Sequence, residues 1–196
     1  TYESIEKGGL GVVLRGRRGE SAETRTAESV LVATGRTPNT SGLGLKAAGV
    51  SLNGAGAIKV DAHLGTTRTG TYAAGDVTGN DAFVYMAAYG AKVAALNALN
   101  GDTIAYDNRA MPAVVFTDPQ VASVGLTEVQ ARLAGYDVKA RVLALDQLPR
   151  ALAARDVRGL IKLVADVKTD KLLGAHILAP EGADSIQTAV LAIKVG

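Results

Sequence analysis

Asp76 is the residue whose type and position in this sequence most directly suggest ligand binding. It ends the β-compatible run Thr71–Gly75 and is followed by a polar turn over residues 77–81. An alanine-rich stretch over residues 82–99 then predicts a helix. In α/β sheets, ligands bind beyond the carboxyl ends of strands, where helix starts offer N–H groups. We therefore expect Asp76 and this helix start to hold a large cofactor. The alternative is a carboxylate that only caps the helix or the turn.

The start of the predicted helix is the second candidate group. Backbone N–H groups near Phe83–Tyr85 carry a partial positive charge, which could stabilise negative charge on a bound cofactor. The small residues along the helix allow close packing on a sheet, although many buried helices share that property. Asn80 or Asp81 is the predicted N-cap, and Gly101 ends the helix.

Other residue patterns exclude several kinds of site. The segment Gly42–Ala47 matches the dinucleotide fingerprint G-x-G-x-x-A, but it follows a turn and not the strand that the motif requires. His63 and His176 are isolated, so we expect structural histidines and no metal site. The chain has no cysteine, which excludes disulfides and redox-active thiols within these residues.

Composition is that of a folded protein with a small net charge. The chain has 196 residues, of which 47% are hydrophobic and 20% charged, with a formal charge of +2. Such a composition can bury a core, and scattered basic residues argue against a nucleic-acid partner. No apolar run has the length of a membrane span, so we expect a cytoplasmic protein. A start without methionine and an end inside an apolar helical pattern suggest a piece of a longer protein.

The first hundred residues predict mainly short strands. Three of them, 2–7, 10–15 and 20–26, are expected to form an antiparallel meander. The apolar run Ser29–Gly35 predicts a strand buried on both faces. A short helix over 43–48 and strands over 57–61 and 71–76 follow in the prediction.

From residue 110 onward, the pattern predicts an α+β domain. Thr127 and Gln130 form a capping box, which starts a helix that ends near Gly135. A second helix over 182–194 carries apolar residues at helical spacing. The predicted strands are 113–117, 121–125, 136–145, 159–165 and 171–178, with a hairpin at 166–170.

Three ordered motifs give the chain a resemblance to the flavin disulfide reductases, also called pyridine nucleotide-disulfide oxidoreductases. Val30–Asn39 resembles the end of their nicotinamide domain, Thr71–Asp76 their second FAD motif, and Pro112–Gly125 the start of their dimerisation domain. The segments Phe116–Gln120 and Leu148–Ala153 are most similar to the members that reduce Hg(II). Dihydrolipoamide dehydrogenase and glutathione reductase typically carry histidine at the position of Asp118 in this segment.

The resemblance implies a fold with α/β and α+β parts. Part of a Rossmann-like FAD/NAD(P) domain pair would be followed by a dimerisation domain with an antiparallel sheet and helices. Residues 1–37 would be the tail of the nicotinamide domain, 38–109 the returning part of the FAD domain, and 110–196 a dimerisation domain that forms a homodimer.

The resemblance also implies roles for individual residues. Asp76 would bind the ribityl chain of FAD, and Gly75 would belong to the same cofactor-binding site. The backbone of Phe83, Val84 and Tyr85, Val84 in particular, would face the pyrimidine edge of the flavin. Gly35 would lie close to the nicotinamide cofactor, NADPH or NADH. Val114 would lie near the nicotinamide itself.

In such enzymes, NAD(P)H reduces flavin, the flavin reduces a cysteine pair, and the thiols pass electrons to Hg(II), giving Hg(0). Because the cysteine pair is absent from this chain, we expect the chain alone to be inactive. Two alternatives stay open: a parent that reduces thiol–disulfide substrates, and an inert dimerisation module. Size-exclusion chromatography with a flavin absorbance spectrum would separate the last from a cofactor-binding chain.

Overall fold

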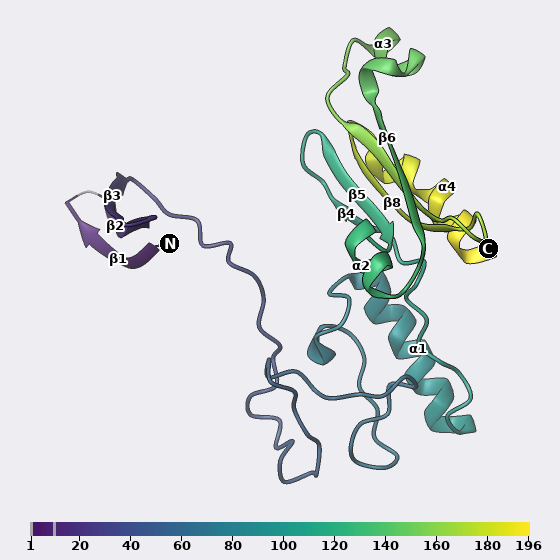
Figure 1. Ribbon diagram of the computed structural model, residues 1–196. Coiled ribbons are helices and arrows are strands. Elements are labelled where there is room, and N and C mark those ends of the chain that lie inside the picture. The colour runs from purple at the N-terminus through teal and green to yellow at the C-terminus, as the bar shows by residue number, and fades with distance from the viewer. Residues whose placement is uncertain (1, 10) are drawn as a thin grey trace. The chain divides into compact units, whose positions relative to one another are not determined.

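The chain folds into two units that differ in secondary structure. A computed structural model describes residues 2–9 and 11–196 (Figure 1). The first unit is Thr1–Ile104 and the second is Ala105–Gly196. Within the described residues, every helix is too short or too polar to cross a membrane.

The first unit begins with a three-stranded antiparallel sheet. Its strands, in the order β1-β2-β3, are β1 (Tyr2–Gly8), β2 (Gly11–Arg18) and β3 (Ser21–Ala27). The predicted meander is therefore confirmed, although Leu10, the first residue of the predicted strand 10–15, lies outside the described residues. Most residues of β1 and β3 are exposed, as expected for a sheet with one face in solvent.

The prediction of a buried strand over residues 29–35 is wrong. These residues form no strand, and the side chains of Leu31 and Val32 are 89% and 65% exposed. A strand forms when a neighbouring strand pairs with its backbone groups. In the part of the chain that the structure describes, no segment pairs with this run. The apolar pattern is present, but the sheet that it would enter is not.

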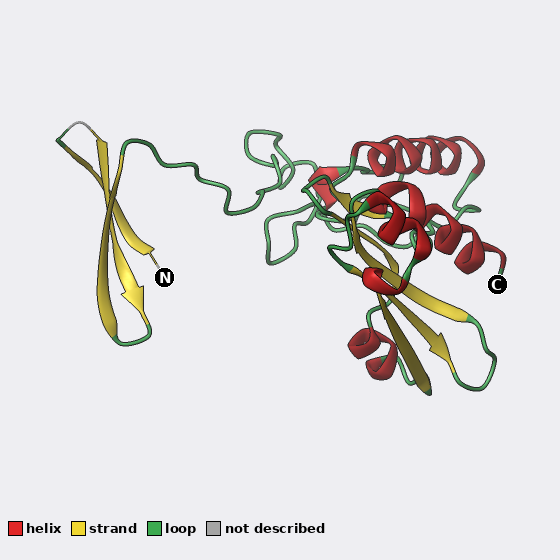
Figure 2. Ribbon diagram, turned by 90° about the horizontal axis from the view of Figure 1, so that it is seen from above, coloured by secondary structure: helices red, strands yellow, loops and turns green. Residues whose placement is uncertain are grey.

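Residues 38–83 are held in turns where two strands and a helix were predicted (Figure 2). The expected helix at 43–48 is a set of turns, closed by a 2.9 Å bond from Val50 N to Leu45 O. The expected strands at 57–61 and 71–76 are also wrong, because they form only isolated bridges: Leu52 with Ile58, Val60 with Thr66, and Gly65 with Tyr72. Side-chain oxygens in this segment accept hydrogen bonds from backbone N–H groups that would otherwise pair two strands. Such side-chain bonds favour turns.

Helix α1 (Val84–Asn100) is the long regular element of the first unit. Its buried residues Met86, Gly90, Val93 and Asn97 follow one face at helical spacing. Gly101 ends the helix, as predicted. The predicted N-cap at Asn80 or Asp81 is wrong, because Phe83 is the N-cap and its side chain makes no cap bond. Asp81 adopts a φ of 27°, so the chain turns three residues before the helix begins.

The second unit contains a five-stranded antiparallel sheet in the order β4-β5-β8-β7-β6. The strands are β4 (Ala113–Val115), β5 (Gln120–Gly125), β6 (Val138–Ala144), β7 (Leu160–Asp166) and β8 (Leu172–Ala179). The helical elements are α2 (Glu128–Leu133), η2 (Leu145–Gln147), α3 (Pro149–Ala154) and α4 (Gly182–Val195). This arrangement confirms the predicted α+β architecture.

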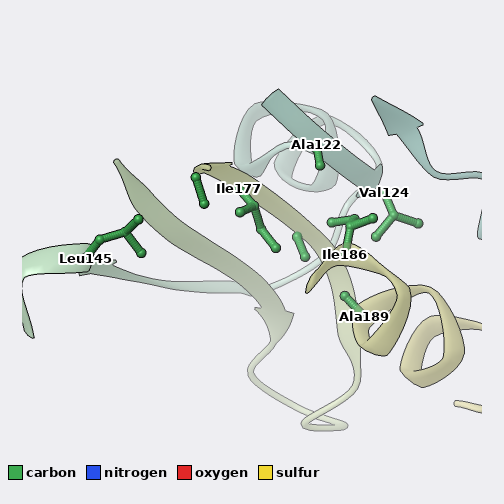
Figure 3. Packing of buried hydrophobic residues seen from close by; sticks show 8 residues of the cluster. Ala122, Val124, Leu145, Ile177, Ile186 and Ala189 are labelled. Atoms are coloured by element: carbon green, nitrogen blue, oxygen red, sulfur yellow. The ribbon is translucent and has the colours of Figure 1, made fainter. Parts of the chain in front are cut away.

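One apolar core joins the sheet to α4 (Figure 3). Ile186 is 0% exposed and lies against small side chains on the central strands. Small residues let the helix approach the sheet, and close approach matters because apolar area removed from water is the main stabilising term. The buried members are Ala122, Val124, Leu145, Ala175, Ile177, Ala179, Ile186 and Ala189.

Two local features hold the segment that follows β5 in place. The capping box of α2 is confirmed: Thr127 Oγ1 accepts from Gln130 N at 3.2 Å, and Gln130 Oε1 accepts from Thr127 N at 2.9 Å. Gly174 lets Leu126 approach β8, since a Cβ at this position would lie 2.0 Å from Leu126 O.

Candidate functional site

Asp76 is the first residue of a single 3₁₀ turn, η1 (Asp76–Thr78). The preceding Gly75 has φ 81° and ψ −164°, a conformation that residues with a side chain rarely adopt. A Cβ on Gly75 would also lie 3.2 Å from the Cβ of Ala87. Gly75 therefore allows the turn to lie directly against the first turns of α1. This packing brings Asp76, the next residue, near the first turns of that helix.

Hydrogen bonds hold the backbone of this turn and leave the carboxylate accessible. Gly79 N donates to Asp76 O at 3.0 Å, and Thr78 Oγ1 donates to Gly75 O at 2.8 Å. The Asp76 side chain is 52% exposed, and its Oδ2 accepts from Arg36 Nη1 at 3.2 Å. In the part of the chain that the structure describes, no donor reaches Oδ1. That oxygen can accept a hydrogen bond from a ligand.

The N-terminus of α1 presents backbone and apolar groups to solvent. Phe83 is extended at the N-cap, and its carbonyl accepts from the N–H groups of Met86 and Ala87, both at 3.0 Å. The Val84 N–H has no acceptor within the described chain, and the Val84 side chain is 85% exposed. This N–H lies at the positive end of the helix dipole, where it favours an electron-rich atom.

Two aromatic rings flank Val84. The rings of Phe83 and Tyr85 stack with their centroids 5.3 Å apart and an interplanar angle of 21°. Burial, and then the negative charge of Asp81, raise the pKa of the Tyr85 hydroxyl, so this ring stays neutral at physiological pH. The stacked pair makes the helix start an apolar surface with polar groups at its edge.

The structure brings together most of the residues predicted for the site. Gly75 and Asp76 lie against α1, and Gly35, with φ 109°, precedes the arginine that pairs with Asp76. Val114 belongs to the second unit, where it is half-buried in β4 and packs against the apolar core. Its predicted role near the nicotinamide stays a prediction, as do the other ligand roles.

Sequence reasoning missed two residues of this region. Arg36 is 40 residues from Asp76, and no local pattern pairs them. Asn97 is 1% exposed and links two separate loops: its Nδ2 donates to His63 O and Ile104 O, and its Oδ1 accepts from Ile104 N. The spacing of Asn97 on the buried face of α1 was a signal that could have identified it.

The two histidines have backbone partners. His63 Nδ1 lies 3.2 Å from Ile104 O, and His176 Nε2 lies 3.2 Å from Leu126 O. Among the described residues, no three side chains of the metal-binding types gather in one place. The chemistry that the Asp76 region offers is therefore hydrogen bonding and charge stabilisation, which serve to bind and orient a ligand.

Comparison with known proteins places this geometry in a family. The family described as pyridine nucleotide-disulphide oxidoreductase matches residues 3–95, and the dimerisation domain of the same family matches residues 111–196. The chain belongs to the pyridine nucleotide-disulphide oxidoreductases. The Asp76 region lies in the first match and the five-stranded sheet in the second.

The chain is similar to two kinds of enzyme in this family, mercuric reductases and a disulfide reductase. The chain is 46% identical to a mercuric reductase of Bacillus cereus over all of its length and 31% of the relative. It is 51% identical to a mercuric reductase of Acidithiobacillus ferrooxidans, over 86% of this chain and 30% of the relative. A solved structure, the HOCl-induced flavoprotein disulfide reductase RclA from Escherichia coli, is 31% identical with a TM-score of 0.83, over 100% of this chain and 44% of that one. The chain thus spans about a third of the curated relatives that it matches.

Proposed function

We propose that this chain is part of an FAD- and NAD(P)H-dependent enzyme that reduces Hg(II) to Hg(0). The observation that carries the proposal is an accessible carboxylate, Asp76, that directly follows a glycine packed against Ala87 of α1. The identity of 46% and 51% to mercuric reductases supports Hg(II) as the substrate. In this reading, the residues of the chain bind the flavin and assemble the dimer.

The groups around Asp76 fit the ribityl and pyrimidine parts of a flavin. A ribityl chain carries hydroxyl donors, and Asp76 Oδ1 is an acceptor that no described residue occupies. The pyrimidine edge carries carbonyl oxygens, and the Val84 N–H is a donor at a positive helix end. When bound, the flavin would supply electron transfer from NAD(P)H towards the metal substrate.

The residues of this chain would orient the flavin and stabilise its charge. Asp76 would accept a ribityl hydroxyl, with Gly75 holding the turn against α1. The helix start would favour negative charge at the pyrimidine edge, and this preorganised donor costs no reorganisation during reaction. The exposed side chain of Val84 would exclude water from that edge.

We assign one role to each of three consecutive segments of the chain. Residues 1–37 would end the nicotinamide domain, 38–109 would complete the FAD domain, and 110–196 would form the homodimer. Exposed apolar side chains in the second unit support the last assignment, for example Val115 at 57%, Phe116 at 78% and Val121 at 46% exposed. Val115 of β4 pairs with Val121 of β5, and large exposed apolar residues gathered in one place are typical of protein interfaces.

Flavin content of the full-length protein tests this proposal. Asp76→Ala should raise the dissociation constant of FAD about tenfold or more, because a hydrogen bond to a charged group is lost. Asp146→Asn, which changes an exposed acid of the second unit, is the matched control and should bind FAD normally. Unchanged flavin occupancy in Asp76→Ala would remove Asp76 from the site.

Reduction of a thiol–disulfide substrate is the second candidate, and the likeness to the flavoprotein disulfide reductase supports it. Asp118 favours mercury, because the thiol–disulfide enzymes that this chain resembles typically carry histidine at this position. In the structure, Asp118 Oδ1 accepts from Arg158 Nη2 at 2.9 Å. Steady-state NADPH oxidation with Hg(II), lipoamide and glutathione disulfide as alternative acceptors distinguishes the two candidates.

A further inference from the structure

The ion pair between Arg36 and Asp76 joins two segments that are distant in sequence. Arg36 follows the apolar run of residues 29–35, and Asp76 opens the turn beside α1. Four residues after Arg36, Thr40 Oγ1 donates to Gly56 O at 2.7 Å. Thr40 thus anchors the chain to the region that contains Asp76, and this anchor limits the volume that the Arg36 side chain can reach.

The geometry of the pair leaves half of the carboxylate available. Only Oδ2 is engaged, by Arg36 Nη1 at 3.2 Å, and Oδ1 has no donor among the described residues. The backbone of Asp76 is already held by the bond from Gly79 N. Rotation of the carboxylate is therefore the main remaining freedom, since this torsion of aspartate has a broad energy minimum. Arg36 restricts that rotation.

Charge gives the pair a second consequence. A flavin dinucleotide carries a pyrophosphate, so an isolated carboxylate in its site repels it. A guanidinium 3.2 Å from the carboxylate offsets that charge while Oδ1 keeps its ability to accept a hydrogen bond. Both side chains are exposed, at 76% for Arg36 and 52% for Asp76, so the pair contributes little to folding stability.

We propose that Arg36 is a positioning residue for flavin binding: it holds Oδ2 of Asp76 so that Oδ1 meets a ribityl hydroxyl. This inference rests on the proposed flavin function of Asp76. Arg36 acts through Asp76 and makes no contact of its own with the cofactor. It also makes flavin affinity depend on the segment that follows Gly35, which the proposed function assigns to the nicotinamide domain.

A double-mutant cycle in the full-length protein tests the inference, with FAD as the titrated ligand. Arg36→Gln should raise the dissociation constant of FAD about two- to fivefold, the range that an exposed charge pair supports. Arg36→Lys should restore most of the affinity, because a single nitrogen makes the contact. In the Asp76→Asn background, Arg36→Gln should have no further effect, since the residue through which it acts has lost its charge.

Two controls separate positioning from a general structural role. Arg25→Gln removes an arginine of β3 that is paired with Glu23 at 2.7 Å, and it should leave the affinity for FAD unchanged. The melting temperature of the apoprotein should be the same for Arg36→Gln and the parent.

Each outcome of the cycle has a definite meaning. Normal FAD affinity in Arg36→Gln overturns the inference while an effect of Asp76→Asn upholds the flavin function. Additive losses in the double variant also overturn it, because Arg36 then contacts the cofactor directly. If neither single variant changes affinity, the assignment of the flavin site to Asp76 fails as well.

Discussion

Residues 38–104 and residues 105–196 keep their backbones in place by different means. In the first region, three isolated bridges replace a sheet, and side chains bond to the backbone of the turns. Asn53 Oδ1 accepts from Ala55 N and Ala57 N, and Asp61 Oδ1 accepts from His63 N and Gly65 N. In the second region, five strands pair along antiparallel ladders, with one register shift between Val164 and Ala165.

This difference predicts where each region is vulnerable. Backbone bonds of a sheet are shared among many residues, so the apolar core under the sheet should be the sensitive part of the second unit. Where one polar side chain holds several backbone groups, its removal leaves all of them unsatisfied. Substitutions of single residues can test this contrast, and the core of the second unit should give the largest effect.

Ile186→Ala should destabilise the second unit by about 3 kcal/mol, because the side chain is fully buried and its loss leaves a cavity. Leu191→Ala on the same helix is the control. Its side chain is 64% exposed, so a change below about 0.5 kcal/mol is expected. Urea unfolding followed by hydrogen exchange in β7 and β8 measures both. Similar values for the two variants would contradict the assignment of the core.

Asn97→Ala should give the next largest effect, about 2 kcal/mol in the first unit. The substitution removes three hydrogen bonds and leaves the carbonyls of His63 and Ile104 without their buried donor. Faster hydrogen exchange should be confined to the loops around these two residues.

Asn100→Ala is the matched control for this substitution. Asn100 Nδ2 bonds to Leu96 O within its own helix and is exposed, so its loss should change stability by less than about 0.5 kcal/mol. If Asn97→Ala were equally mild, polar side chains would not be what holds residues 38–104 in place.

The same contrast explains which elements could be predicted from sequence. Strands that pair with sequence neighbours, such as β7 with β8, and the Thr127–Gln130 capping box depend on local patterns, and their prediction is confirmed. The run at 29–35 has the pattern of a buried strand, but strand formation depends on a pairing segment that the described chain does not supply. Pattern alone cannot show whether the pairing segment exists.

The candidate site divides in the same way. Asp76, Gly75 and the start of α1 are close in sequence, so their motif predicted that they would lie together. Arg36 joins Asp76 through a fold-dependent contact across 40 residues, and the sequence held no periodic signal for it. Single long-range polar contacts are the part of a site that sequence patterns do not reveal.

Thr127→Ala should cost about 1 kcal/mol, the usual effect of removing an N-cap hydroxyl. The effect is smaller than those in the core and at Asn97, because one helix end frays while the sheet stays paired. Thr127→Ser keeps the oxygen that accepts from Gln130 N and should behave like the parent. Thermal unfolding of both variants measures the difference, and equal losses would show that the methyl group, and not the cap, matters.

Asp156 tests whether side-chain hydrogen bonds also stabilise the second unit in a connection outside its sheet. It lies between α3 and β7, and its Oδ1 and Oδ2 accept from Arg158 Nε at 2.9 Å and Nη2 at 2.7 Å. These side-chain bonds, followed by a bond from the Arg158 backbone N–H, lower the pKa of Asp156 from its ordinary 3.8 to about 2. The folded state therefore favours the ionised form.

A lowered carboxyl pKa sets the sign of the pH dependence. The stabilisation is fully present above about pH 4 and is lost as the pH falls towards 2, because protons then bind the unfolded state first. Asp156→Asn should be less stable than the parent at pH 7, and the difference should vanish as the pH falls below about 2. Solvent reaches both side chains of the pair, so salt screens it and 1 M salt should also reduce the difference. A pH-independent difference would mean that Asp156 acts through the backbone geometry of its loop, as Asn53 and Asp61 do in residues 38–104, and the two regions would then differ only in how often they use this device.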